Sequence, residues 1–199
     1  MSHHIYNTKG IVLSSFPIGE SDKLFKIFTR ELGLVDATAQ GVRKTESKNR
    51  YGLQDFSLLH ISLVRGREVW RITNVSTIKN LFFDLEEKKD ARESLIKIIL
   101  FVQKLVHGEE KNEKLFYLVL NAFEFLKQKE TSPTSLKSFE TIYFLKILDN
   151  LGYFDKNIQE EKFKDFLSCD VTNDLINKMS FVEKDAQIEI NEALKETHL

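Results

Sequence analysis

The sequence of 199 residues contains 42% hydrophobic and 30% charged residues, which is typical of an ordinary soluble globular protein. No segment is long and apolar enough to span a membrane, and the first ten residues lack the profile of a signal peptide. We therefore expect a cytoplasmic protein with no membrane partner. The net charge of −1 hides an asymmetry, because residues 1–80 carry +5 and residues 81–199 carry −6. Two surfaces with different partners would explain this imbalance, as would the scatter of solvated charges.

The first eighty residues are predicted to form β-strands. Apolar and polar side chains alternate here, as where Val35, Ala37 and Ala39 share one face of a strand. The predicted strands include residues 11–16, 24–30, 35–40, 59–63 and 69–75. Five short strands with a longer connection between the third and the fourth match an OB-fold barrel, and an SH3-like barrel fits the pattern nearly as well.

Beyond residue 81 the apolar residues take a helical period. Two apolar stripes cover residues 95–106 and 115–126. Pro133 begins a third helix that is apolar nearly all round and ends at Gly152, so we expect it at the centre of a bundle. Shorter helices are predicted at residues 163–167, 171–179 and 188–194.

These patterns predict an α+β protein with two domains. Residues 1–80 are predicted to form a small β-barrel domain of the OB or SH3-like type, and residues 81–199 are predicted to form an α-helical domain. The chain has one cysteine, Cys169, which excludes an internal disulfide framework and a multi-cysteine zinc site.

A basic, turn-rich loop followed by a hairpin occupies residues 41–71. Its seven cations are Arg43, Lys44, Lys48, Arg50, Arg65, Arg67 and Arg71. Tyr51 and Trp70 are candidate platforms for base stacking, whereas Phe56 is expected in the barrel core. A surface that contacts phosphate groups would explain this pattern, and a flexible solvated loop is the alternative.

Sequence motifs of catalytic sites are absent. There is no Walker-type phosphate loop, no GxGxxG and no HExxH. The five histidines are scattered without the spacing of a metal or catalytic site, and His60 is expected to face solvent from its strand. We therefore expect a binding protein without catalytic residues, cofactor or metal, and not an enzyme.

Four short motifs follow one another in the first part of the chain. They are Gly19–Asp22 (GESD), Ile27–Gly33 (IFTRELG), Gly41–Lys44 (GVRK) and Leu53–Phe56 (LQDF). In this order they resemble the N-terminal domain of the RecO family of bacterial DNA repair and recombination mediator proteins. The pair Phe139-Glu140 and the segment Leu151–Tyr153 are similar to motifs in the helical part of that family, so the resemblance covers residues 5 to about 155.

The resemblance implies that residues 1–80 form an OB-fold nucleic-acid-binding domain and that residues 81–199 form an α-helical domain, with no catalytic site. RecO-like proteins bind single- and double-stranded DNA, anneal complementary strands, and act with RecR to load RecA onto strands coated by single-stranded DNA-binding protein. The implied location is the cytoplasm, in association with the nucleoid. The family's barrel also contacts RecR, so some of its surface would serve protein. The implied DNA-contact candidates are Lys9, Lys23, Lys26, Arg30, Arg43, Lys44, Lys48, Arg50, Arg65, Arg67 and Arg71, of which Arg43, Lys44, Lys48 and Arg50 are favoured.

The sequence departs from the family after the Leu151–Tyr153 segment. Many members carry a four-cysteine zinc module there, whereas this chain has only Cys169, so zinc binding is not implied. The family's helical domain also receives the acidic, hydrophobic tail of single-stranded DNA-binding protein, for which the weak candidates are Lys127, Lys129, Lys137 and Lys146. The alternative function is a non-catalytic interaction module that tethers RecR or single-stranded DNA-binding protein and binds DNA weakly.

Overall fold

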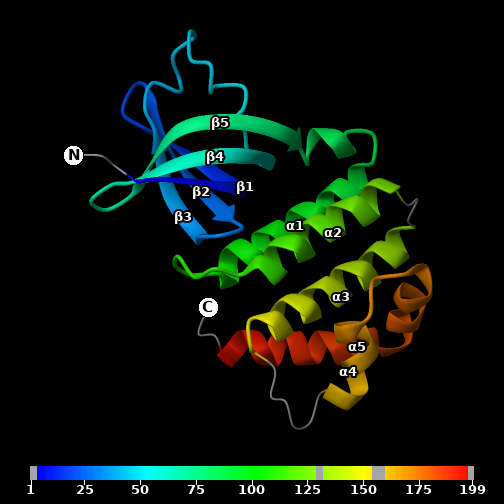
Figure 1. The fold of residues 1–199 in the computed structure, drawn as a ribbon. Helices are drawn as coiled ribbons and strands as arrows, with labels where there is room; N and C mark the ends of the chain where they lie inside the picture. Colours follow the sequence, from blue (N-terminus) through cyan, green and yellow to red (C-terminus); the bar gives the residue numbers. More distant parts are fainter. Residues whose placement is uncertain (1–3, 129–131, 154–159, 197–199) are drawn as a thin grey trace. The chain divides into compact units, whose positions relative to one another are not determined.

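The computed structural model describes residues 4–128, 132–153 and 160–196 (Figure 1). The chain divides into two compact units. The first comprises Met1–Glu86 and Leu105–Phe116, and the second comprises Glu87–Lys104 and Tyr117–Leu199. The predicted division between residues 80 and 81 had assigned Leu105–Phe116 to the helical part.

Five strands form the core of the first unit. Their bounds are β1 Ile5–Ile18, β2 Asp22–Thr29, β3 Gly33–Ala39, β4 Ser57–Arg65 and β5 Trp70–Asn80. Each strand pairs with two neighbours, and the order β1-β2-β3-β5-β4 closes into a barrel (Figure 1). All pairings are antiparallel except that between β3 and β5, where Ala37 pairs with Trp70 and Thr38 with Arg71. The predicted α+β class and OB-fold barrel are confirmed.

The barrel forms because each strand has one apolar face. In β3, Val35, Ala37 and Ala39 are buried and the residues between them are half-buried, as the two-residue period predicts. In β4, Leu59 and Leu63 are fully buried in the same cluster. Burying each such large apolar side chain contributes roughly 1.5–3 kcal/mol, so the strand pattern is sufficient to select the inner face.

The turn between β2 and β3 carries a docking contact with the segment before the second long helix. Gly33 has a φ of 69°, a conformation in which a residue with a Cβ is strained. A Cβ at this glycine would lie 2.3 Å from the backbone oxygen of Glu110. The Leu34 N–H donates to the Gly108 carbonyl at 3.1 Å. These contacts explain why Leu105–Phe116 belongs to the barrel unit.

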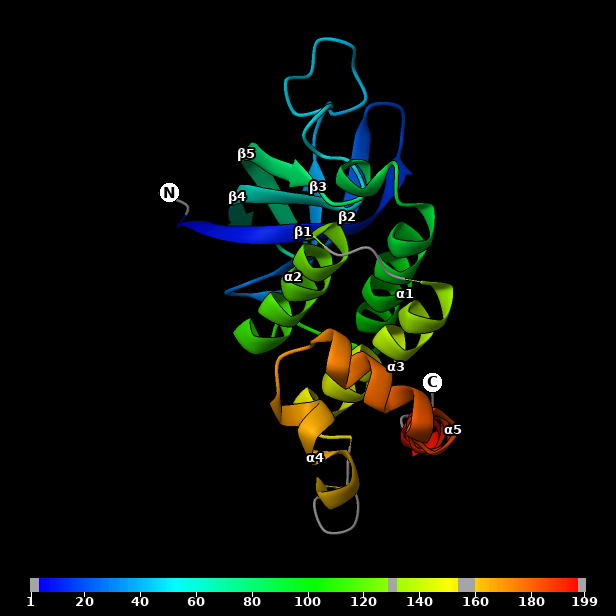
Figure 2. The same ribbon diagram turned by 90° about the vertical axis from the view of Figure 1, so that its right-hand side faces the viewer.

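The helices follow the barrel strands in sequence (Figure 2). A short 3₁₀ turn at Phe83–Leu85 precedes them, and their bounds are α1 Lys89–Leu105, α2 Glu113–Gln128, α3 Pro133–Asn150, α4 Glu160–Ser168 and α5 Asn173–Glu196. In the second unit α3 packs against α4 and α5. The start of α3 is confirmed, because the Ser132 hydroxyl accepts a hydrogen bond from the Ser135 N–H ahead of Pro133.

Helix α3 is the centre of the helical unit, as its apolar sequence predicted. Buried residues occur on all its sides, including Phe139, Ile142 and Leu148. Glu140 is buried as well, and its carboxylate accepts from the Ser94 hydroxyl at 2.6 Å and from the Lys97 ammonium at 2.9 Å. A buried carboxylate needs such partners to offset its desolvation. The Phe139-Glu140 pair therefore contributes one core ring and one buried charge whose hydrogen-bond partners are in place.

One prediction for the C-terminal part was wrong. Residues 171–179 and 188–194 were predicted as two helices, but they lie in one helix, α5. Met179, Ala186 and Ile190 are all buried, at spacings of seven and four residues. The small Ala186 therefore continues the buried stripe through a polar segment that had been taken as a break.

Replacing Gly33 by alanine is expected to destabilise the barrel unit. The substitution adds the cost of a positive φ and a clash with the Glu110 backbone, so we expect a loss of roughly 2 kcal/mol or more in the free energy of unfolding, measured by urea titration. Gly19→Ala is the matched control, because Gly19 has a φ of 56° and a methyl group at this position would meet nothing within 4 Å. Equal losses in the two variants would contradict the docking contact.

Candidate nucleic-acid interface

The loop between β3 and β4 projects beyond the strands of the barrel (Figure 2). It is anchored at both ends by apolar side chains, since Val42 and Leu53 are 3% and 2% exposed and belong to the barrel core. Successive turns order the segment between them, with the Ser47 N–H donating to the Lys44 carbonyl at 3.1 Å and the Arg50 N–H to the Ser47 carbonyl at 3.2 Å. The exposed part of the loop is therefore short and held at its base.

A carboxylate from the β1–β2 turn fixes that base. Asp22 Oδ1 accepts from the Gly41 N–H at 2.8 Å and from the Ser21 hydroxyl at 2.9 Å. The bond from Gly41, then the bond from Ser21, and the nearby positive charge of Lys44 hold the pKa of Asp22 below its ordinary value. Arg43 adds two contacts, from its N–H to the Ser21 carbonyl at 2.9 Å and from its Nη1 to the Gly19 carbonyl at 2.8 Å. The turn and the loop thus form one surface.

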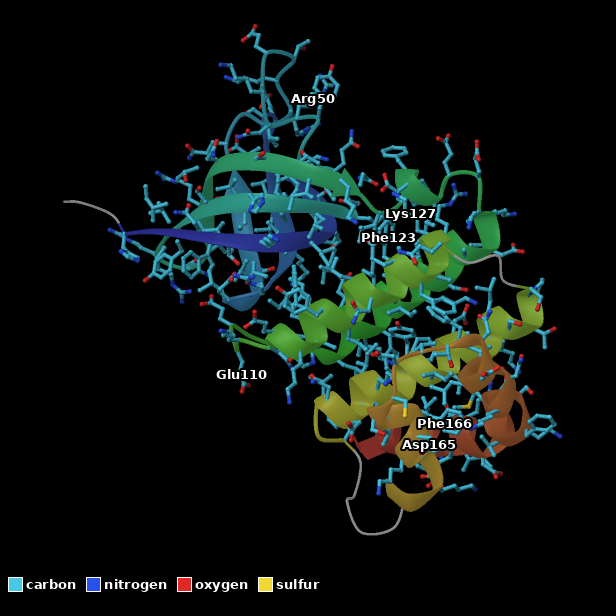
Figure 3. All side chains as sticks on the ribbon, turned by 45° about the vertical axis from the view of Figure 1, so that its right-hand side comes forward. Arg50, Glu110, Phe123, Lys127, Asp165 and Phe166 are labelled. Atoms are coloured by element: carbon cyan, nitrogen blue, oxygen red, sulfur yellow. The ribbon has the colours of Figure 1, made fainter. Side chains whose placement is uncertain are left out.

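The four favoured cations lie on this loop. Arg43, Lys44, Lys48 and Arg50 are all exposed, and Figure 3 shows Arg50 on the projecting part of the loop. None of the four forms an ion pair with a carboxylate among the residues that the structure describes. Their charges are therefore available to an anionic ligand.

Three of the other predicted cations are engaged by carboxylates. The Lys26 ammonium lies 3.0 Å from Asp36, across the β2–β3 pair. Arg30 pairs with Glu31 and, at 3.8 Å, with Glu113. Arg65 pairs with Glu109. Such partly exposed pairs are weak, but each lowers the net positive charge at its position.

The remaining candidates differ in exposure. Arg67 and Arg71 are exposed, and Lys9 is half-buried. Lys23 is also half-buried, and its ammonium donates to the Ser15 hydroxyl at 3.4 Å at the foot of the loop.

Of the seven cations of residues 41–71, Arg65 and Arg67 lie apart from the basic loop, whereas Arg71 pairs with Thr38, next to the end of β3 where the loop begins. The β4–β5 hairpin adjoins the start of β1, where Ile5 pairs with Val64, whereas the basic loop is bonded to Gly19 just beyond the end of β1. The hairpin and the loop therefore lie at opposite ends of a 14-residue strand (Figure 1). The expectation that Arg65 and Arg67 would reinforce the loop is corrected by this topology.

Two expectations for aromatic residues are also corrected. Trp70 is only 4% exposed, its Nε1 donates to Glu109 at 3.0 Å, and the Arg65 guanidinium lies 4.8 Å from its ring centroid, so it presents no open face for a base. Phe56 is half-buried, and it lies outside the buried barrel cluster. Tyr51 is 75% exposed, as a stacking platform requires. His60 is exposed, as predicted.

A cleft of about 580 Å³ lies at the foot of the loop. Its lining includes Lys23, Arg50, Tyr51, Phe56, Phe82 and Phe83. Phe82 and Phe83 were not among the predicted site residues, because they lie in the segment where the apolar period changes from strand to helix. The sequence signal that could have identified them is a pair of adjacent aromatic residues directly after the last strand. Of two adjacent rings at this position, one cannot enter the core.

Three of the weak candidates of the helical unit are engaged by other groups of that unit. Lys137 pairs with Glu183 at 2.5 Å, and the Lys127 ammonium lies 5.6 Å from the ring centroid of Phe123. Lys146 donates to the carbonyls of Leu167 and Cys169 at 2.9 and 2.8 Å, and burial lowers its pKa. Lys129 lies outside the described residues.

Neither a metal site nor a membrane span is found in the described part of the chain. No group of three or more histidine, cysteine or acidic side chains is placed there to hold an ion. None of its helices combines the length and the apolar character that crossing a bilayer requires.

A closed five-stranded barrel that presents unpaired cations beside aromatic rings is typical of OB-folds that bind nucleic acid. A family model described as "Recombination protein O N terminal" matches residues 1–81. Three curated relatives, each named DNA repair protein RecO, come from Alkaliphilus metalliredigens, Caldicellulosiruptor saccharolyticus and Rubrobacter xylanophilus. They are 29%, 28% and 31% identical to this chain over 149, 191 and 122 residues. The chain is therefore similar to RecO proteins, and residues 1–81 match the N-terminal domain of that family.

The similarity covers part of each protein. The three alignments include 74%, 96% and 60% of this chain, and 58%, 73% and 49% of the respective relatives. The chain therefore spans between about half and three quarters of the length of these relatives.

Replacing Asp22 by alanine is expected to loosen the basic loop. Because trypsin cleaves after lysine and arginine, loosening should raise the rate of tryptic cleavage within residues 43–50, measured by mass spectrometry of the fragments. Asp36→Ala, which removes a carboxylate on the β2–β3 pair, is the control and should leave that rate unchanged.

The same contact should depend on pH. The pKa of Asp22 is lowered on folding, so its contribution is complete above the ordinary value of 3.8 and is lost as the pH falls through the folded-state pKa. Pepsin, which acts in acid, should therefore attack the loop of the wild-type chain faster as the pH falls below about 4. Equal loop cleavage in wild type and Asp22→Ala at neutral pH would contradict the anchoring role.

Proposed function

We propose that this chain is a DNA-binding recombination mediator that contacts single-stranded DNA through the β3–β4 loop. The observation that carries the proposal is the set of four exposed loop cations that lack ion pairs among the described residues, on an OB-fold barrel of the RecO family. The whole chain has a net charge of −1, so its overall field does not attract nucleic acid. Attraction would come from the local charge of the loop.

Contacts through phosphate groups suit the annealing of complementary strands. Lysine and arginine side chains that bind the DNA backbone fix its position without using the edges of the bases. Two strands held in this way keep their base edges free to pair. Binding of double-stranded DNA would use the same charges, because both forms carry a dense row of phosphates.

The family resemblance supports three further parts of the proposal. The chain acts with RecR to load RecA onto single-stranded DNA, it receives the tail of single-stranded DNA-binding protein, and it has no catalytic role. The proposal assigns RecR contact to barrel surface away from the loop. The place that receives the tail of single-stranded DNA-binding protein is left to experiment.

One observation favours the alternative of a tethering module with weak DNA binding. Lys26, Arg30 and Arg65 are neutralised locally by carboxylates, which leaves fewer cations for DNA than the sequence suggested. This alternative predicts retained binding of RecR or of single-stranded DNA-binding protein without annealing of complementary strands.

Removing the four loop cations tests the proposal. The variant Arg43→Ala/Lys44→Ala/Lys48→Ala/Arg50→Ala should bind a single-stranded oligonucleotide more weakly, on the order of 1 kcal/mol per lost contact at low salt. Because each phosphate contact contributes about 0.7 to the slope of log affinity against log salt for single strands, the slope should flatten by roughly 3. Fluorescence anisotropy over a range of salt concentrations measures both quantities.

A control with the same loss of charge separates the loop from the overall field. Lys104→Ala/Lys178→Ala/Lys184→Ala/Lys195→Ala removes four exposed helical lysines and should retain more of the affinity and the slope. Strand annealing, followed by the pairing of two labelled oligonucleotides, should fall only in the loop variant. Unchanged affinity and slope in the loop variant would refute the assignment of DNA binding to this loop.

A further inference from the structure

Three phenylalanine rings form a continuous wall in the cleft at the foot of the basic loop. The rings of Phe56 and Phe82 are near-parallel, with an interplanar angle of 17° and centroids 6.1 Å apart. Phe83 meets Phe82 edge to face at 5.7 Å and is itself 55% exposed. Tyr51, 75% exposed, also lines the cleft. So much exposed aromatic surface in one place is costly to leave in water, and this favours a flat apolar ligand.

The backbone around this wall is held rigidly. Phe56 has a φ of 65°, which is strained for a residue with a Cβ, and two hydrogen bonds hold it there. Its N–H donates to the Val12 carbonyl at 2.8 Å, and its carbonyl accepts from the Leu81 N–H at 3.0 Å. Asn80 joins the two sides of the wall, because its side chain donates to the Asp55 carbonyl at 3.1 Å and accepts from the Phe82 N–H at 3.0 Å. The rings are therefore pre-organised.

Cations line the same cleft. Lys23 and Arg50 contribute to its lining, and Asp55 is the carboxylate that accompanies them. Arg50 is exposed and has no ion pair among the described residues. A ligand that combines a flat ring with a nearby negative charge would satisfy both features of the cleft, and a nucleotide within a strand has this combination. The volume of about 580 Å³ lies within the range of roughly 300–1,000 Å³ of sites that enclose small ligands.

We propose that this cleft captures an unpaired nucleobase of single-stranded nucleic acid, stacked on Phe83 and Tyr51, while Lys23 and Arg50 bind the adjoining phosphates. The inference rests on the proposed function and deepens it, because it gives the loop surface a preference for single strands. A base inside a duplex has both faces covered by its neighbours and cannot enter the cleft without being unstacked. Stacking on aromatic side chains tolerates every base, since each has a π-face.

The test uses the double variant Tyr51→Ala/Phe83→Ala. Both side chains are more than half exposed, so their removal leaves the barrel core intact. We expect its affinity for a single-stranded oligonucleotide to fall about 10- to 100-fold, from the loss of one to two stacked positions, with the slope against salt unchanged. Duplex affinity should stay within about twofold of wild type. An oligonucleotide of abasic sites should bind wild type and variant equally. Phe181→Ala, which removes an 88% exposed ring on α5, is the control and should bind like wild type.

The outcomes separate this inference from the proposed function. One outcome is that wild type binds single strands with a salt slope that depends on the loop cations, while the double variant binds equally well. In that case the cleft does not hold a base, and this inference fails while the proposed function stands. If wild type binds no single-stranded oligonucleotide, both fail. Equal losses for single-stranded, abasic and duplex ligands would assign the two rings to the structure of the loop and overturn the inference. The inference would also be overturned if a short acidic peptide with an aromatic C-terminus bound wild type but not the double variant while both proteins retained oligonucleotide binding.

Discussion

The parallel pairing of β3 with β5 is the constraint on which the barrel unit depends. It brings Ala37 beside Trp70, and the small alanine side chain leaves room for the indole inside the barrel. Trp70 is held by a hydrogen bond to Glu109, on the segment that docks at Gly33. Closure therefore involves residues from three separate parts of the sequence. It removes the exposed edges that an open sheet would present.

The sequence motifs shared with the family have physical explanations in the structure. The GESD turn and the GVRK segment are the two sides of one contact, in which the Asp22 carboxylate accepts from the Gly41 N–H and Arg43 bonds back to the turn. The LQDF segment supplies Leu53 to the barrel core and Phe56 to the cleft. The GVRK and LQDF segments each combine an anchor with a residue that is exposed or lines the cleft, which is how a loop can be both ordered and accessible.

Charge pairing distinguishes the basic loop from three other predicted cations of the barrel. Lys26, Arg30 and Arg65 have acidic neighbours across the sheet or on the docked segment, and these neighbours reduce their pull on an anion. The loop lies beyond the strand ladder, and the carboxylate at its base is Asp22, near Lys44, while Arg43, Lys48 and Arg50 form no ion pair among the described residues. An uncompensated local charge on a nearly neutral protein gives binding that is short-ranged and sensitive to salt. Such binding would suit the proposed annealing of complementary strands.

The sequence by itself determined the elements of the fold and the four cations of the loop. Strand and helix periods can be read along the chain, so the presence of the five strands, the buried helix α3 and its Ser132 cap were correctly predicted. The first half of β1 and the continuity of α5 were missed. The tertiary structure alone decided which aromatic rings and which cations are accessible. Trp70 is buried, Phe56 lies outside the core, and Phe82 and Phe83 line the cleft. The local sequence does not predict this, because ring exposure depends on contacts between residues distant in sequence. Ion pairs such as Arg65 with Glu109, 44 residues apart, are invisible to any local pattern for the same reason.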